Sequence, residues 1–266
     1  MVYWYLFSGL LIVLLVLAKF FLFGHHARLR VLMYHRVSNN GQKDGLTVAV
    51  NNLEEQFNYL LKEGYVPILL SDLVKYVRFG KPLPKRPVLI TFDDGYRDNY
   101  TVMYPLLKKY GMKANIFLVP SFLQNEQEPI NGATDEYLHV SDINSMDHHL
   151  VEYGLHSFDH KNYKHLSPQE LDHDIVKSKA LLITMNIPFQ PCLAFPYGAF
   201  PKRSPVKLHS FFSTLTDNKI ALAFRIGNRL NSLPLRNPLL VQRLDVRGSD
   251  SFEKFVKLLR KGKQWI

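Results

Sequence analysis

Short apolar runs alternate along the chain with segments in which apolar residues recur every three or four positions. The short runs are typical of buried strands, predicted over 31–35, 67–70, 88–94, 114–119, 150–155, 192–195 and 221–226. The periodic segments predict helices over 52–62, from 71 onward, and over 98–110, 141–149, 167–185 and 251–261. Strands that alternate with helices favour a parallel sheet or an α/β barrel. The polar segment 121–139 is expected to be a surface insertion.

The first 24 residues have a different pattern. Met1 to Ala18 contains no charged side chain, and Lys19 is the only charge before Gly24. A basic start and a small-residue cleavage site, both typical of a signal peptide, are missing. We therefore expect residues 1–24 to form an uncleaved transmembrane helix and residues 25–266 to form one catalytic domain.

Composition narrows the class of protein. Apolar residues make up 47% of the 266 positions, which favours a packed core over disorder. A single cysteine, Cys192, excludes an internal disulfide framework and a cysteine-rich zinc site. The net charge of +10 indicates attraction to anionic surfaces, but no basic motif with interleaved aromatic residues predicts nucleic-acid binding.

The chemistry is predicted to centre on the strand that ends in Phe92-Asp93-Asp94-Gly95. Adjacent carboxylates raise each other's pKa, so a pair at the end of a buried strand needs a compensating cation. The carboxyl ends of parallel strands are also where catalytic groups gather. A plain Asp-Gly turn is the alternative interpretation.

Two further segments strengthen the metal hypothesis. His156 and His160 follow a predicted strand and are four residues apart, so both imidazoles can reach one ion, although surface histidines are the alternative. One carboxylate and two imidazoles leave coordination positions open, as a hydrolytic site requires. Phe195-Pro196-Tyr197-Gly198 is either an ordinary turn or a groove wall whose backbone N–H groups could hold an oxyanion.

With these motifs in this order, the segment from about Val31 to Val246 resembles the polysaccharide deacetylases of the NodB-homology type, carbohydrate esterase family four. The opening Leu32-Met33-Tyr34-His35 is similar to the branch that deacetylates poly-β-1,6-N-acetylglucosamine in biofilms. The resemblance implies a distorted (β/α) barrel with fewer strands than a full TIM barrel. It also implies an N-acetylated glycan substrate.

The resemblance assigns roles to the motif residues. It implies a divalent metal, usually Zn²⁺, held by Asp94, His156 and His160, with Asp93 as general base. Pro196 and Tyr197 would line the substrate groove, and the Tyr197 N–H would stabilise the oxyanion.

Two expected residues are missing from the family's usual positions. No late strand ends in a histidine, so we hypothesise a circular permutation in which His35 is the general acid, brought in by a closed barrel. No arginine lies between Lys161 and Pro201, and Arg243 is the candidate that would orient Asp93. A structural histidine and a surface arginine are the respective alternatives.

The leading function is a membrane-anchored, metal-dependent carbohydrate N-deacetylase with a monomeric catalytic domain. A deacylase of a lipid-linked or lipopolysaccharide sugar, a hydrolase of small cyclic amides and a catalytically silent glycan-binding module are the alternatives. Lys19, near the end of the predicted anchor, and Arg28, Arg30 and Arg36 after it favour a cytoplasmic domain by the positive-inside rule. The resemblance favours the opposite side, outside the cytoplasm, and we give it more weight.

Overall fold

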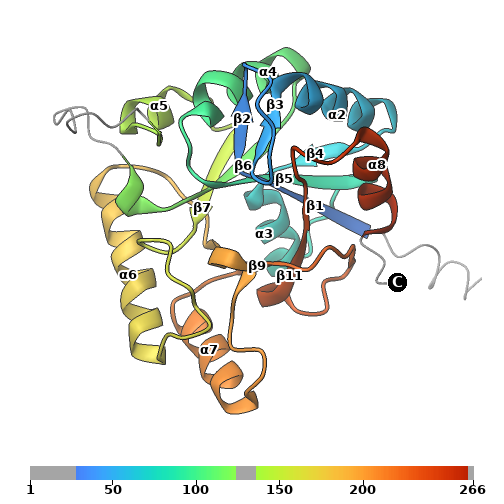
Figure 1. The fold of residues 1–266 in the computed structure, drawn as a ribbon. Helices are drawn as coiled ribbons and strands as arrows, with labels where there is room; N and C mark the ends of the chain where they lie inside the picture. The colour runs from blue at the N-terminus through green and yellow to red at the C-terminus, as the bar shows by residue number, and fades with distance from the viewer. Residues whose placement is uncertain (1–27, 124–135, 263–266) are drawn as a thin grey trace, which may run out of the picture.

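Seven parallel strands close into a barrel in the computed structural model, which describes residues 28–123 and 136–262 (Figure 1). The order around the barrel is β1, β11, β9, β8, β7, β6 and β5, and β5 pairs again with β1. The strands are β1 (Arg28–Tyr34), β5 (Pro87–Asp94), β6 (Ala114–Leu118), β7 (Val151–Leu155), β8 (Cys192–Ala194), β9 (Leu222–Ile226) and β11 (Val241–Asp245). The prediction of a barrel with fewer than eight strands is confirmed.

Strand β1 closes the barrel by pairing on both sides. Its residues from Arg30 to Tyr34 run parallel to β5, and Leu32 and Met33 pair with the end of β11. The first and last strands of the barrel are therefore neighbours, which is the arrangement that the permutation hypothesis requires.

Four short strands lie outside the ring. β4 (Val66–Ile68) extends the sheet beside the start of β5, and β10 (Asn231–Ser232) pairs antiparallel with the start of β1. β2 (Arg36–Ser38) and β3 (Thr47–Ala49) form a separate parallel pair after β1. Of these, only β4 was predicted from the apolar pattern.

Helices surround the barrel and close its amino end. Leu70, Leu73 and Val74 of α3 pack into the same cluster as residues from the starts of the strands, so α3 plugs the barrel at that end. The α-helices are α2 (Val50–Lys62), α3 (Leu70–Phe79), α4 (Tyr104–Tyr110), α5 (Val140–Ser145), α6 (Pro168–Thr184), α7 (Pro205–Asp217) and α8 (Phe252–Lys261).

Several helix boundaries follow from local chemistry. Ser167 caps α6, accepting a hydrogen bond from the Glu170 N–H, while the Glu170 carboxylate accepts one from the Ser167 N–H. The predicted helix 98–110 is instead a π-helical turn, η1 (Asn99–Met103), that runs into α4. The apolar pattern did not predict α7. Three 3₁₀ turns complete the fold: η2 (Pro120–Phe122), η3 (Pro196–Gly198) and η4 (Pro238–Leu240).

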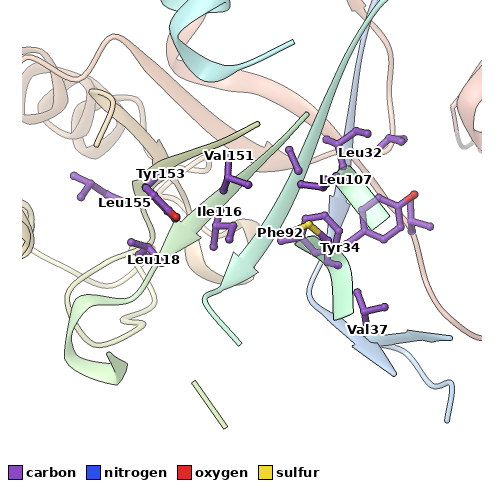
Figure 2. Close-up of a cluster of buried hydrophobic side chains, with 14 of the residues drawn as sticks. Leu32, Tyr34, Val37, Phe92, Leu107, Ile116, Leu118, Val151, Tyr153 and Leu155 are labelled. Atoms are coloured by element: carbon purple, nitrogen blue, oxygen red, sulfur yellow. The ribbon is translucent and has the colours of Figure 1, made fainter. Parts of the chain in front are cut away.

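The core has two layers because side chains alternate along each strand. The outer layer packs between the barrel and its helices, and includes Leu32, Phe92, Ile116, Tyr153 and Leu155 (Figure 2). The inner layer fills the barrel with side chains such as those of Val31, Leu89, Phe117, Phe224 and Val241. Gly154 belongs to this layer, since a Cβ there would lie 2.6 Å from the Phe117 ring. The barrel is therefore a packed core that leaves only its carboxyl end for chemistry.

The predicted anchor over residues 1–24 lies outside the described residues, as do residues 124–135 of the predicted insertion. Within the described ranges, none of the helices combines the length and apolar character needed to cross a membrane.

Candidate active site

The predicted site residues meet at the carboxyl end of the barrel. A cavity of about 430 Å³ opens there. It is lined by seven of the eight predicted residues: His35, Asp93, Asp94, His156, His160, Tyr197 and Arg243. The eighth, Pro196, is buried where it opens the η3 turn after β8. Each of these residues lies in the middle or at the end of a barrel strand, or in the loop that follows it, so the closed parallel barrel brings them to one end.

Asp94, His156 and His160 form a cluster that fits a metal ion. Asp94 Oδ1 lies 3.4 Å from His156 Nε2 and 3.3 Å from His160 Nε2, and the three ligand atoms all lie within 4.8 Å of one another. This carboxylate oxygen is buried and has no hydrogen-bond partner. An unpaired buried carboxylate oxygen is costly unless a cation satisfies it, so the cluster matches the donor set of a three-ligand zinc site.

The two imidazoles are oriented by their other nitrogens. His156 Nδ1 lies 2.9 Å from the Ala194 carbonyl oxygen, which can only accept a hydrogen bond. That contact places the proton on Nδ1 and leaves Nε2 free to face Asp94. His160 Nδ1 lies 3.1 Å from the Tyr197 hydroxyl. Burial lowers the pKa of His156 to about 3 and also lowers that of His160, which keeps both rings neutral, as metal ligands must be.

Asp93 faces the interior of the barrel and is paired with Arg243. The guanidinium Nη1 lies 2.5 Å from Asp93 Oδ1, and Nη2 lies 2.7 Å from Oδ2. Both side chains are almost fully buried. Burial is the largest single effect and favours the neutral acid, but the charge and hydrogen bonds of Arg243, together with smaller effects of His156 and His35, outweigh it and lower the pKa of Asp93 to about 2. The two-bond contact holds the carboxylate ionised and in one orientation.

The neighbouring Asp94 has the opposite electrostatics. Burial, followed by repulsion from Asp93, raises its pKa to about 6. Its φ of 74° turns the chain sharply at the end of β5, so the two carboxylates point to different partners. His160 and Tyr197 also have positive φ, at 60° and 59°. Three of the residues at the mouth of the cavity thus adopt a left-handed conformation that side chains disfavour, a feature that clusters at functional sites.

His35 directly follows β1 and lines the same cavity. Its backbone carbonyl accepts a 2.9 Å hydrogen bond from Asn99 Nδ2, which fixes the chain where it leaves the strand. Positive charge on His35 has a small lowering effect on the pKa of Asp93 and is the largest of the effects that lower the pKa of Asp94. The histidine therefore lies close enough to the acids to share their electrostatics, as the closed barrel requires.

Asp174, which was not predicted from the sequence, supports the loop that carries the two histidines. Asp174 is buried on α6 and accepts hydrogen bonds from Ser157 Oγ at 2.9 Å, the Phe158 N–H at 3.2 Å and the Tyr163 hydroxyl at 2.7 Å. One signal was available: Asp174 occupies the apolar face of a helix between Leu171 and Ile175. A carboxylate in that position needs polar partners.

Comparison with known families agrees with this geometry. Residues 80–211 match the family model described as polysaccharide deacetylase. That segment contains both aspartates, both histidines and Tyr197, but neither His35 nor Arg243. The two residues that the resemblance could assign only by hypothesis are thus the two outside the match.

Curated relatives point the same way. The chain is 30% identical over 174 residues to YxkH of Bacillus subtilis, whose name places it among polysaccharide deacetylases, and the match covers 65% of this chain and 58% of that protein. It is 26% identical over 187 residues to the poly-β-1,6-N-acetyl-D-glucosamine N-deacetylase of Staphylococcus aureus, with 63% of each covered. The chain thus spans about three fifths of the length of these relatives.

Solved structures share the fold. A Streptococcus pyogenes deacetylase, PplD, in complex with acetate superposes with a TM-score of 0.72 at 19% identity, over 89% of this chain and all of that one. IcaB from Ammonifex degensii gives a TM-score of 0.70 at 22% identity, over 88% and 97% of the two chains. These solved structures show the fold, and the family model together with the curated relatives shows that the chain contains a polysaccharide deacetylase domain, matched over residues 80–211.

Proposed function

We propose that this protein is a metal-dependent N-deacetylase that removes acetyl groups from N-acetylglucosamine residues of a polysaccharide. One observation carries the proposal: the unpaired Asp94 oxygen faces two neutral imidazoles, and the arginine-paired Asp93 lies beside them in one cavity. The names of the curated relatives support N-acetylglucosamine as the acetylated sugar.

Asp94, His156 and His160 would hold the metal, with Zn²⁺ the best match to one oxygen and two nitrogen donors. A bound divalent cation supplies Lewis acidity, which polarises the acetamide carbonyl and lowers the pKa of a coordinated water. The buried carboxylate and the two oriented rings form the site before any ion arrives, so little reorganisation is needed.

Asp93 acts as the general base. Arg243 keeps it ionised and directs it, so the carboxylate accepts a proton from water as the oxygen attacks the acetamide carbon. His156 Nε2 lies 3.7 Å from Asp93 Oδ2, which places the base beside the ligand cluster. An anionic oxygen then develops on the former carbonyl, and the Tyr197 N–H at the cavity wall is proposed to stabilise it.

His35 completes the reaction as the general acid. As the C–N bond breaks, its imidazolium donates a proton to the departing sugar amine, and acetate remains as the second product. Asp93 lies on β5 and His35 directly follows the adjacent β1, since Tyr34 pairs with Phe92. A base and an acid can thus act from two strands on one substrate bond.

The test separates metal binding from catalysis. The purified full chain, stripped with a chelator and reloaded with Zn²⁺, should bind about one metal ion and release acetate from N-acetylglucosamine oligomers. An Asp94→Ala variant should lose the metal, whereas Asp93→Asn should keep the metal and lose turnover. Acetate release by the chelated protein, or by Asp93→Asn at the unmodified rate, would contradict the proposal.

A further inference from the structure

A second hollow, of about 480 Å³, adjoins the catalytic cavity. Tyr197 and Gly198 line both spaces, so the two form a continuous surface. One side of the hollow comes from the loop after β7, at Lys164 and His165. The other side is formed by the segment between η3 and the first turn of α7.

The hollow is lined by four exposed cations: Lys164, Lys202, Arg203 and Lys207, which we call the basic groove. No carboxylate is among its lining residues. Within the described part of the chain, none of the four forms an ion pair. Glu170 lines a neighbouring hollow, and its carboxylate already accepts the Ser167 N–H.

The start of α7 adds to the positive potential. Ser204 lines the groove and caps this 13-residue helix by accepting a hydrogen bond from the Lys207 N–H. The amino end of a helix carries partial positive charge and favours anions nearby. Four unpaired cations and a helix start around one concave surface repel one another, and a bound anion would relieve that repulsion.

The positive charge of the basic groove bears on the choice of substrate because of the proposed reaction, on which this inference rests. Removal of an acetyl group leaves an ammonium on the sugar, and the basic groove repels a neighbouring sugar that has already been deacetylated. A neutral N-acetylglucosamine homopolymer gains no electrostatic binding free energy from the four cations. A glycan with a phosphate or a carboxylate next to the acetylated sugar gains binding free energy from each cation that its anionic group contacts.

We propose that the basic groove binds an anionic group of the glycan, so that the preferred substrate is an acidic polysaccharide that contains N-acetylglucosamine. Tyr197 forms the wall between the two spaces, with a side chain 65% exposed. The acetylated sugar would occupy the catalytic cavity while its acidic neighbour occupies the groove. Phosphate and carboxylate groups are both anionic and would both be recognised by the groove. Substrates that carry one or the other distinguish between them.

The test compares three oligosaccharides on the zinc-loaded full chain: a neutral N-acetylglucosamine oligomer, the same oligomer with one 6-phosphate, and an oligomer that alternates N-acetylglucosamine with glucuronic acid. We expect a higher kcat/KM for an acidic oligomer than for the neutral one, and a preference that falls between about 50 mM and about 500 mM salt. The double variant Lys202→Gln/Arg203→Gln should lower the acidic-to-neutral ratio roughly five- to tenfold.

The matched control is Lys81→Gln/Lys85→Gln, which removes two exposed charges from the segment before β5, at the opposite end of the barrel. It should leave the ratio unchanged. A ratio that neither the groove variant nor salt alters, or a preference for the neutral oligomer, would overturn the inference. The acid that gives the larger ratio identifies the anion.

Failure of the proposed activity would look different, because no oligomer would release acetate. Equilibrium binding of each oligomer to the unmodified protein and to the groove variant then tests the groove by itself. Equal affinities for the acidic and neutral oligomers would refute the groove as an anion site.

Discussion

At the scale of single residues, the site depends on keeping two adjacent aspartates chemically different. Asp93 follows the strand alternation into the barrel and meets Arg243, whereas Asp94 turns at a positive φ toward His156 and His160. One carboxylate is neutralised by a side-chain cation, which holds its pKa at about 2. The other has a buried oxygen without a partner and a pKa of about 6. Environment alone therefore suits Asp93 to the proposed role of base and Asp94 to that of metal ligand.

Arg243→Met tests the base-orienting contact. It leaves the buried Asp93 carboxylate without its cation, so the free energy of unfolding should fall by about 3–5 kcal/mol. Burial would then raise the pKa of Asp93, and kcat/KM should fall about a hundredfold because the proposed base is no longer held in place. Urea denaturation and acetate release measure the two effects.

The control for this variant is Arg86→Met, which breaks an exposed ion pair with Glu63 and should change stability by less than about 1 kcal/mol. If Arg243→Met matched the control in both stability and turnover, Arg243 would have no role in orienting the base.

His35→Asn tests the general acid. The change removes the proton donor but none of the predicted metal ligands, so kcat should fall by roughly 10²–10⁴ while the zinc content stays the same. Metal analysis and acetate-release kinetics on the same preparation provide both readouts. His209→Asn, an exposed histidine on α7, is the matched control. Unchanged turnover in His35→Asn would remove this residue from the mechanism.

At the scale of elements, the loop that carries His156 and His160 is held by α6, the helix that follows it in the sequence. Asp174 on α6 gathers hydrogen bonds from Ser157, Phe158 and Tyr163 and thereby fixes the turn between His156 and His160. Such outer contacts orient ligands that the loop alone could not hold. The capping box of α6 depends only on neighbouring residues, whereas the burial of Asp174 on this helix depends on its contacts with the histidine loop.

Asp174→Ala should therefore weaken zinc binding about 10- to 100-fold. The three donors would lose their acceptor, so the free energy of unfolding should also fall by about 2–4 kcal/mol. Competition with a metal chelator measures the affinity. Asp172→Asn changes an exposed carboxylate on the same helix and should leave zinc affinity unchanged. Equal zinc affinities for the two variants would show that α6 does not position the ligands.

Some helices and strands could be predicted from the sequence and others could not, for physical reasons. Strands such as β5 and β6 are continuous apolar runs because both faces are buried, which makes them readable from the sequence. The apolar spacing of its segment did not predict helix α7, although the helix begins with Ser204 as N-cap and Pro205 at the first helical position, a typical helix start. The two-residue β10 depends on pairing with β1.

At the scale of the whole molecule, barrel closure assembles the site. β1 lies between β5 and β11, so residues more than 200 positions apart, His35 and Arg243, line one cavity. α3 fills the amino end of the barrel, so the cavity with the candidate catalytic residues opens at the opposite end. The basic groove lies on the same face as the catalytic cavity. A single face of the molecule thus carries both of the spaces that we propose to contact the glycan.

The location of this face relative to the membrane is a prediction from the amino-terminal sequence and from the family. We expect residues 1–24 to anchor the chain and the catalytic domain to lie outside the cytoplasm, where polysaccharide substrates are found, although the basic residues after residue 18 favour the reverse. Protease added to intact cells should degrade the domain. Degradation only after the membrane is permeabilised, in parallel with a cytoplasmic marker protein, would place the domain inside.

The sequence by itself determined the alternation of strands and helices, the two acids at the end of β5 and the histidine pair after β7, because these depend on local spacing and on burial of short apolar runs. Only the tertiary structure decided which distant partners they meet. Arg243 reaches Asp93, and His35 enters the cavity, because the barrel closes through β1. Asp174 supports the histidine loop because α6 packs beside it. Contacts across a closed barrel join residues that share no local pattern, so spacing along the chain could suggest them but not establish them.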